Sequence, residues 1–163
     1  MENHSFFDRC YKLWVLMAQT RDAIWKARHR ELLKYQLSAP AIAVLIAVET
    51  IGDKATPANI SRYIFREVHS VSELLNRMEK KGLIRRTKGM NGKNRVGVSL
   101  TEKGREIYQS QLEDAKSICN VMSVLSEEEV QQMRSSLEKL QVKALEEIVS
   151  QYKIPVPAFS NDW

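Results

Sequence analysis

Several features that mark common classes of protein are missing from this sequence of 163 residues. It contains no run of about 18 uncharged apolar residues, the length that a membrane-spanning helix needs. Its first residues lack the basic-then-apolar layout of a secretory signal. Its two cysteines, Cys10 and Cys119, lie far apart without C-x-x-C spacing, so neither a disulfide framework nor a zinc site is expected. We therefore expect a cytoplasmic protein that holds no metal and contacts no membrane.

The motifs of common enzymes are also absent. The sequence has no nucleophile elbow, no metal-ligand spacing and no glycine loop of the kind that binds phosphates. One Ser/His cluster, His69 with Ser70 and Ser72, has no acidic partner that the sequence can place beside it. The sequence thus predicts that the protein is not an enzyme and needs no cofactor. A catalyst of unknown type remains as an alternative.

Apolar residues recur at spacings of three and four over most of the chain, which predicts a mainly α-helical protein. Start and stop signals divide the pattern into six helices. These begin near Phe6, Ser38, Thr56, Ser70, Thr101 and Ser126. The fourth, over residues 70–81, has a buried side of Val71, Leu74, Leu75 and Met78, and the fifth extends its apolar stripe through Cys119 to Met122. Ser126 to Glu129 fits a capping box at the start of the sixth helix.

Residues 85–100, RRTKGMNGKNRVGVSL, predict a β-hairpin. The pair Asn91-Gly92 favours a two-residue type I′ turn, because both positions of that turn need positive φ. In the resulting register Ile84 faces Ser99 and Lys88 faces Arg95. One face of the hairpin then gathers apolar residues for a core, and the other gathers cations: Leu83, Val96, Val98 and Leu100 on the first; Arg86, Lys88, Lys93 and Arg95 on the second.

Positive charge is concentrated around this hairpin. Residues 77–95 contain eight Lys and Arg residues against one acid, Glu79. Like charges that face each other across a hairpin are destabilising, and a polyanion would offset that cost. DNA is such a partner, because each phosphate neutralised by Lys or Arg releases condensed counterions. Taken alone, a solvated surface hairpin explains the charge run equally well.

The fourth helix decides between these two interpretations. Its free side carries donors, acceptors and cations, among them Asn76 and Arg77. In a major groove Arg reads guanine O6 and N7, and Asn reads adenine N6 and N7. Two helices followed by a charged hairpin form the winged helix-turn-helix layout. Residues 69–95 therefore predict an interaction with double-stranded DNA.

The sequence resembles the MarR-type (multiple antibiotic resistance regulator) transcription factors over nearly its whole length. The resemblance lies in SVSELLNRMEKKGLIRR, in VSLTEKGREIY after the hairpin, and in LSEEEV at the last helix. The stretch FREVHSVSELL is also similar to MarR-type regulators of organohalide-respiring anaerobes. The resemblance implies a homodimer that binds a roughly palindromic operator and represses until a small ligand or oxidation releases it. It implies one domain over 1–163, with residues 1–36 and 101–163 for dimerisation and 37–100 as the winged helix-turn-helix.

Carried over by position, the resemblance places Ser70, Ser72, Glu73, Asn76 and Arg77 in the recognition helix and residues 88–95 in the wing. The full set of candidate DNA-binding residues is His69, Ser70, Ser72, Glu73, Asn76, Arg77, Arg86, Lys88, Lys93, Asn94 and Arg95. The chain departs from the family at Gly92 and Asn94, where an Asp and an Arg are usual, and at Phe65-Arg66-Glu67, where the turn usually contains Gly. Glu73 replaces a common basic residue; we favour a helix cap with Ser70 over acceptance of a cytosine amino group.

The cysteines and the tryptophans of the first helix each allow more than one interpretation. Cys10, beside Arg9 and Lys12, has the setting of a redox sensor, although its place in the apolar stripe favours packing, and Cys119 is expected in the core. Trp14 and Trp25 with Arg21 and Arg28 line either an effector pocket or, as we favour, a core or dimer interface. The effector itself stays unknown. The alternative function is a winged-helix module that binds an acidic protein partner or structured RNA.

Overall fold

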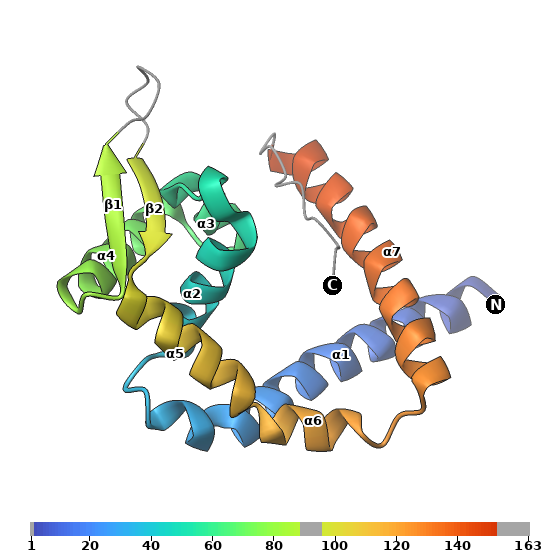
Figure 1. Cartoon of the computed structure of the whole chain (residues 1–163). Coiled ribbons are helices and arrows are strands. Elements are labelled where there is room, and N and C mark those ends of the chain that lie inside the picture. Colours follow the sequence, from blue (N-terminus) through green and yellow to red (C-terminus); the bar gives the residue numbers. More distant parts are fainter. Residues whose placement is uncertain (1, 89–95, 153–163) are drawn as a thin grey trace.

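The computed structural model describes residues 2–88 and 96–152, and it is mainly helical with one small hairpin (Figure 1). The elements are α1 (Glu2–Leu33), α2 (Ala39–Ile51), a 3-10 turn (Gly52–Lys54), α3 (Pro57–Tyr63), α4 (Val68–Lys80), β1 (Ile84–Lys88), β2 (Val96–Leu100), α5 (Glu102–Glu113), α6 (Lys116–Met122) and α7 (Glu127–Tyr152). This confirms the expected class, mainly α with a β-hairpin wing. Among the described residues, no helix has the length and apolar character needed to cross a membrane.

Most helices begin where the sequence predicts. Thr56 caps α3 by accepting a hydrogen bond from the backbone N of Asn59 at 3.2 Å. Thr101 caps α5 by accepting from Gly104 N at 3.1 Å. The capping box of α7 is confirmed: Glu129 N donates to Ser126 Oγ, and Ser126 N donates to the Glu129 carboxylate. These local bonds satisfy backbone donors that the first turn of a helix leaves without intrahelical partners.

The start of α4 differs from the prediction. The helix begins at Val68 with Glu67 as its N-cap residue, so Ser70 lies inside the first turn and the predicted Ser70–Glu73 capping box is wrong. The cause lies in the preceding turn. Phe65 adopts a left-handed backbone with φ of 52°, and Ser61 Oγ donates to the carbonyl of Arg66 at 2.5 Å. The chain therefore reverses earlier than expected, at the position where the family usually has glycine.

The expected fifth helix is divided into α5 and α6 at Asp114–Ala115. A carboxylate of α1 stabilises the break, because Glu31 accepts from both the backbone N and the hydroxyl of Ser117 at 2.9 Å. The Lys34 ammonium and the Tyr35 hydroxyl bind Asp114 and hold the pKa of that carboxyl below its usual 3.8. The apolar stripe continues across the break, so its periodicity alone predicts one continuous helix.

The register of the hairpin is one residue away from the prediction. β1 and β2 are antiparallel with Ile84 opposite Leu100, Arg86 opposite Val98, and Lys88 opposite Val96. Ile84 is therefore buried with Leu100, whereas the predicted register puts it on the cationic face. Burial of an isoleucine side chain contributes about 1.5–3 kcal/mol, which favours the observed register. The predicted turn at Asn91-Gly92 lies outside the described residues.

Bonds outside the hairpin match this register. Val98 N donates to the carbonyl of Ala55 at 2.9 Å, and Arg86 N donates to the Glu79 carboxylate at 3.0 Å. Both N–H groups thus point away from the partner strand, as they do in a non-hydrogen-bonded antiparallel pair. Val98 is buried beside Arg86, and Val96 is only half-buried. Arg86 therefore lies on the inner face of the hairpin, and its predicted place on an outer cationic face is wrong.

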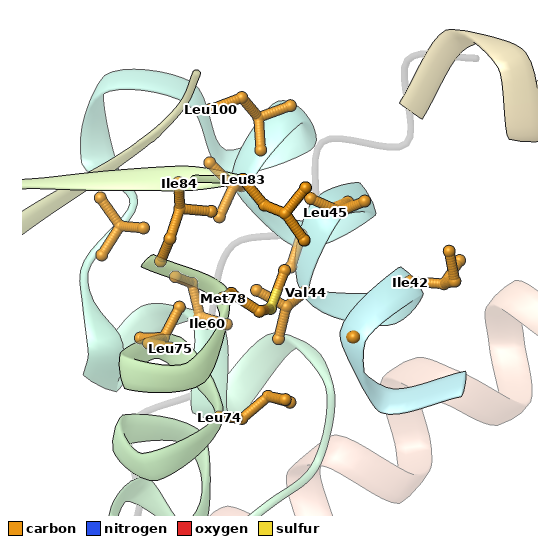
Figure 2. Packing of buried hydrophobic residues seen from close by; sticks show 14 of the residues in the cluster. Ile42, Val44, Leu45, Ile60, Leu74, Leu75, Met78, Leu83, Ile84 and Leu100 are labelled. Atoms are coloured by element: carbon orange, nitrogen blue, oxygen red, sulfur yellow. The ribbon is translucent and has the colours of Figure 1, made fainter. Parts of the chain in front are cut away.

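The hydrophobic core lies within the helix-turn-helix and hairpin part of the chain. Side chains of α2, α3, α4 and the hairpin converge there, as Figure 2 shows for Val44, Ile60, Leu75, Met78 and Leu100. The predicted buried side of α4 is confirmed, with Val71, Leu74, Leu75 and Met78 all buried. In contrast, α1 and α7 extend away from this core (Figure 1) and expose many large apolar side chains.

Candidate DNA-binding surface

Apart from Val68 at its first position, the exposed side of α4 is polar. The buried side of the helix is anchored in the core, and this leaves His69, Glu73, Asn76 and Arg77 exposed, with Ser70 and Ser72 half-buried. The helix is preceded by α3 and the turn at Phe65, and followed directly by the hairpin (Figure 1). A helix held in this way presents side chains that can bond to base edges and phosphates.

Arg86 connects this helix to the hairpin. Its Nη1 donates to Asn76 Oδ1 at 2.7 Å, and its Nη2 donates to the carbonyl of Ser72 at 2.9 Å. Its Nε lies 3.9 Å from Oε2 of Glu79, and Oε1 of Glu79 accepts the backbone N–H of Arg86. Only 24% of the Arg86 side chain is exposed. Three of the predicted site residues, Ser72, Asn76 and Arg86, are therefore brought together, with the guanidinium facing the helix.

Glu79 belongs to this cluster, although the sequence does not predict it as a site residue. The sequence shows it only as the single acid in a run of cations. That isolation is the available signal, since a lone carboxylate among cations is well placed to anchor one of them. Glu79 accepts the backbone N–H of Arg86 and lies within ion-pair distance of its guanidinium, so it ties the end of α4 to the start of β1.

The rest of the predicted wing is described only in part. Lys88 belongs to β1 and lies opposite Val96. Lys93, Asn94 and Arg95 lie outside the described residues, as do the departures from the family pattern at Gly92 and Asn94. His69 and Ser70 approach each other at the start of α4, with 3.5 Å between Nε2 and Oγ.

A groove of about 1010 Å³ runs between α1 and α7 and reaches the turn after α3. Its lining is largely apolar and includes Cys10, Trp14, Phe65, Met133 and Leu137. The cavity does not include the other residues weighed for an effector pocket, Trp25, Arg21 and Arg28. Within the described residues, no group of three or more His, Cys, Asp or Glu side chains is arranged to hold a metal ion.

Three further expectations concern Cys119, Arg28 and Cys10. Cys119 is expected in the core, but it is exposed. Ser117 makes the contact with Glu31 of α1, and Cys119 lies two residues further along α6, on nearly the opposite side of the helix, where it is exposed. Arg28 is buried, and its Nη2 donates to the backbone and side-chain oxygens of Gln111. Cys10 is exposed at the edge of the groove.

Comparison with known proteins supports the same architecture. The MarR family profile matches residues 35–89. The organohalide-sensing transcriptional regulator RdhR, solved ligand-free and with 2,4-dichlorophenol, is 31% identical, with 92% of this chain and 89% of that chain covered and a TM-score of 0.75. The regulator SarZ of Staphylococcus epidermidis is 25% identical over 118 residues, 72% of this chain and 78% of SarZ. The DNA-binding repressor ScoC of Bacillus subtilis is 30% identical over 103 residues, 60% of this chain and half of ScoC.

Proposed function

Because this chain belongs to the MarR family of transcriptional regulators, we propose that it is a homodimeric regulator that binds a roughly palindromic site on double-stranded DNA. The observation that carries this proposal is the polar exposed side of α4, which Arg86 holds against the hairpin. Such a helix fits the major groove, and the wing that follows reaches the neighbouring backbone or minor groove. The eleven candidate residues from His69 to Arg95 form the proposed contact surface.

The apolar surface of α1 and α7 supports a dimer. Phe7 and Trp14 of α1 are 73% and 61% exposed, and Leu137 and Leu140 of α7 are nearly half exposed. Contiguous apolar patches of this kind mark interaction sites, and the groove between the two helices offers room for matching helices of a second copy. We propose that residues 1–36 and 101–163 dimerise, and that residues 37–100 bind DNA.

The proposed mode of action is repression that a small ligand relieves. ScoC, which shares 30% identity, is a DNA-binding repressor, and RdhR, which shares 31%, was solved with 2,4-dichlorophenol. The similarity of this chain to regulators of Staphylococcus epidermidis and Bacillus subtilis supports a cytoplasmic location, since bacterial DNA lies there. The polar cluster of α4 and β1 suits binding rather than turnover, so the proposed function includes no enzymatic step.

Protection footprinting on the DNA that flanks the gene of this protein tests the proposal. Two protected half-sites about 10–10.5 base pairs apart are expected, with an affinity that falls as salt rises. Arg77→Ala should relax base choice at one position of each half-site. Lys93→Ala or Arg95→Ala should weaken all duplexes evenly and reduce the salt slope by about one for each phosphate that is no longer neutralised.

Two results would reject the proposal. Equal affinity for palindromic and scrambled duplexes would favour the alternative partner, an acidic protein surface or structured RNA. Catalytic turnover that disappears on changing one polar residue, while duplex binding survives, would indicate an enzyme.

A further inference from the structure

We propose that Arg86 fixes the carboxamide of Asn76 so that only its N–H donors are offered to DNA, which makes Asn76 select guanine rather than adenine. The inference rests on the proposed function, since it assigns the base preference of the same surface. It assigns Arg86 a positioning role and Asn76 a specificity role. Asn is otherwise expected to read adenine, with its oxygen accepting from N6 and its nitrogen donating to N7.

The chemistry of the contact fixes the orientation of the amide. The guanidinium of Arg86 has only N–H donors, so the Asn76 atom that lies 2.7 Å from Nη1 must be the oxygen. The carboxamide is planar, and Nδ2 therefore lies on the side of Asn76 that is directed away from this bond. Because Asn76 is exposed on α4, both hydrogens of Nδ2 are available to a ligand.

Arg86 is itself held in place by several bonds. Its second terminal nitrogen donates to the carbonyl of Ser72, and its backbone N–H donates to Glu79. Its Nε lies 3.9 Å from the same carboxylate, within ion-pair distance but without a hydrogen bond. It lies on the inner face of the hairpin beside the buried Val98. Charge-assisted bonds of this kind are roughly twice as strong as neutral ones. Turning the Asn76 oxygen toward a base would give up one of these bonds.

The bases differ in what they offer to such a donor. The major-groove edge of guanine presents two adjacent acceptors, N7 and O6, whereas adenine presents the N7 acceptor next to the N6 donor. A carboxamide that offers only N–H groups complements guanine and meets the adenine amino group with a like donor. At the base pair that Asn76 contacts, we expect guanine to be preferred over adenine by about tenfold, within the range typical of a good side-chain contact.

The test is to measure binding of the full-length protein to operator duplexes that differ at single positions. Asn76→Ala identifies the contacted position, because the preference there should disappear. Arg86→Met removes the guanidinium donors, and it should reverse the preference at that position toward adenine. Arg85→Met is the matched control: Arg85 is exposed, faces Ser99 on the opposite side of the hairpin, and loses the same charge. That control should weaken all duplexes evenly and leave the base ranking unchanged.

A second variant serves if Arg86→Met fails to fold. Asn76→Asp keeps an acceptor for Arg86 but removes the N–H donors at an exposed position, so the guanine duplex should lose about tenfold in affinity without a gain for adenine. The inference is overturned if the parent prefers adenine at the contacted position, if Asn76→Ala changes no base ranking, or if Asn76→Asp or a folded Arg86→Met variant keeps the guanine preference. Absence of any sequence-specific duplex binding by the parent would instead overturn the proposed function.

Discussion

Replacing Gly104 with alanine is expected to destabilise the protein strongly, although the residue lies in a helix. Gly104 is in the first turn of α5, which packs closely against the residue that precedes β1. A Cβ atom at this position would lie 1.9 Å from the carbonyl oxygen of Leu83 and 2.9 Å from its carbonyl carbon. That oxygen also accepts from Thr101 N at 3.1 Å. The obstacle is thus backbone that is already hydrogen-bonded, so it cannot move aside like a flexible side chain.

Two opposing effects set the size of the change. Alanine is favoured over glycine in a helix by about 1 kcal/mol. Against this, overpacking costs about 3 kcal/mol when the surroundings cannot relax, and a weakened Leu83–Thr101 bond costs about 1 kcal/mol more. The free energy of unfolding should therefore fall by about 3 kcal/mol, opposite in sign to the helix preference.

Urea unfolding followed by circular dichroism measures this difference. The protomer concentration must be equal in all samples, since the stability of a dimer depends on it. Gln109→Ala is the control, because Gln109 is exposed on the same helix and the change should stay within about 0.5 kcal/mol. A Gly104→Ala protein as stable as the parent would show that the close approach of α5 to Leu83 is not present in solution.

Three further predictions concern other parts of the molecule. The Lys34 ammonium is the main cause that lowers the pKa of Asp114 in the folded protein below the 3.8 of the unfolded chain. The ionised Asp114 therefore stabilises the fold fully above pH 3.8, and this stabilisation is lost as pH falls through the lower pKa of the folded state. Asp114→Asn should be less stable than the parent at neutral pH and should lose less stability on acidification, measured by thermal unfolding from pH 7 downward. Leu137→Glu places a charge in the exposed apolar surface of α7, so the variant should be monomeric in sedimentation assays and should bind the operator weakly. Gln131→Glu introduces the same charge elsewhere on α7 and should stay dimeric. Gln36 is exposed and has φ of 51°, a left-handed backbone that glycine adopts at less cost than glutamine. Gln36→Gly should therefore raise the free energy of unfolding by about 0.5–1 kcal/mol in urea. An unchanged or lower free energy of unfolding would contradict the left-handed backbone at this position.

Features that depend on neighbouring residues could be predicted from the sequence. Caps at Thr56, Thr101 and Ser126 act within three residues, so they set helix starts that the structure confirms. The buried side of α4 follows from spacing alone, because a helix repeats every 3.6 residues. The order of elements in the winged helix-turn-helix and the polar side of α4 could also be predicted, because both depend on local sequence patterns.

Features that depend on residues far apart in the chain could not be predicted in this way. The break between α5 and α6 depends on Glu31 binding Ser117, and the hairpin register depends on burying Ile84 and on Ala55 accepting from Val98. At the α5–α6 break and in the hairpin register, contacts between distant residues set a structure that the local sequence pattern does not predict. The position of Arg86 follows from that register, since a shift of one residue moves every side chain of a strand to the opposite face. The charge pattern thus identified the surface, and long-range packing set which of its cations face α4 and which face outward.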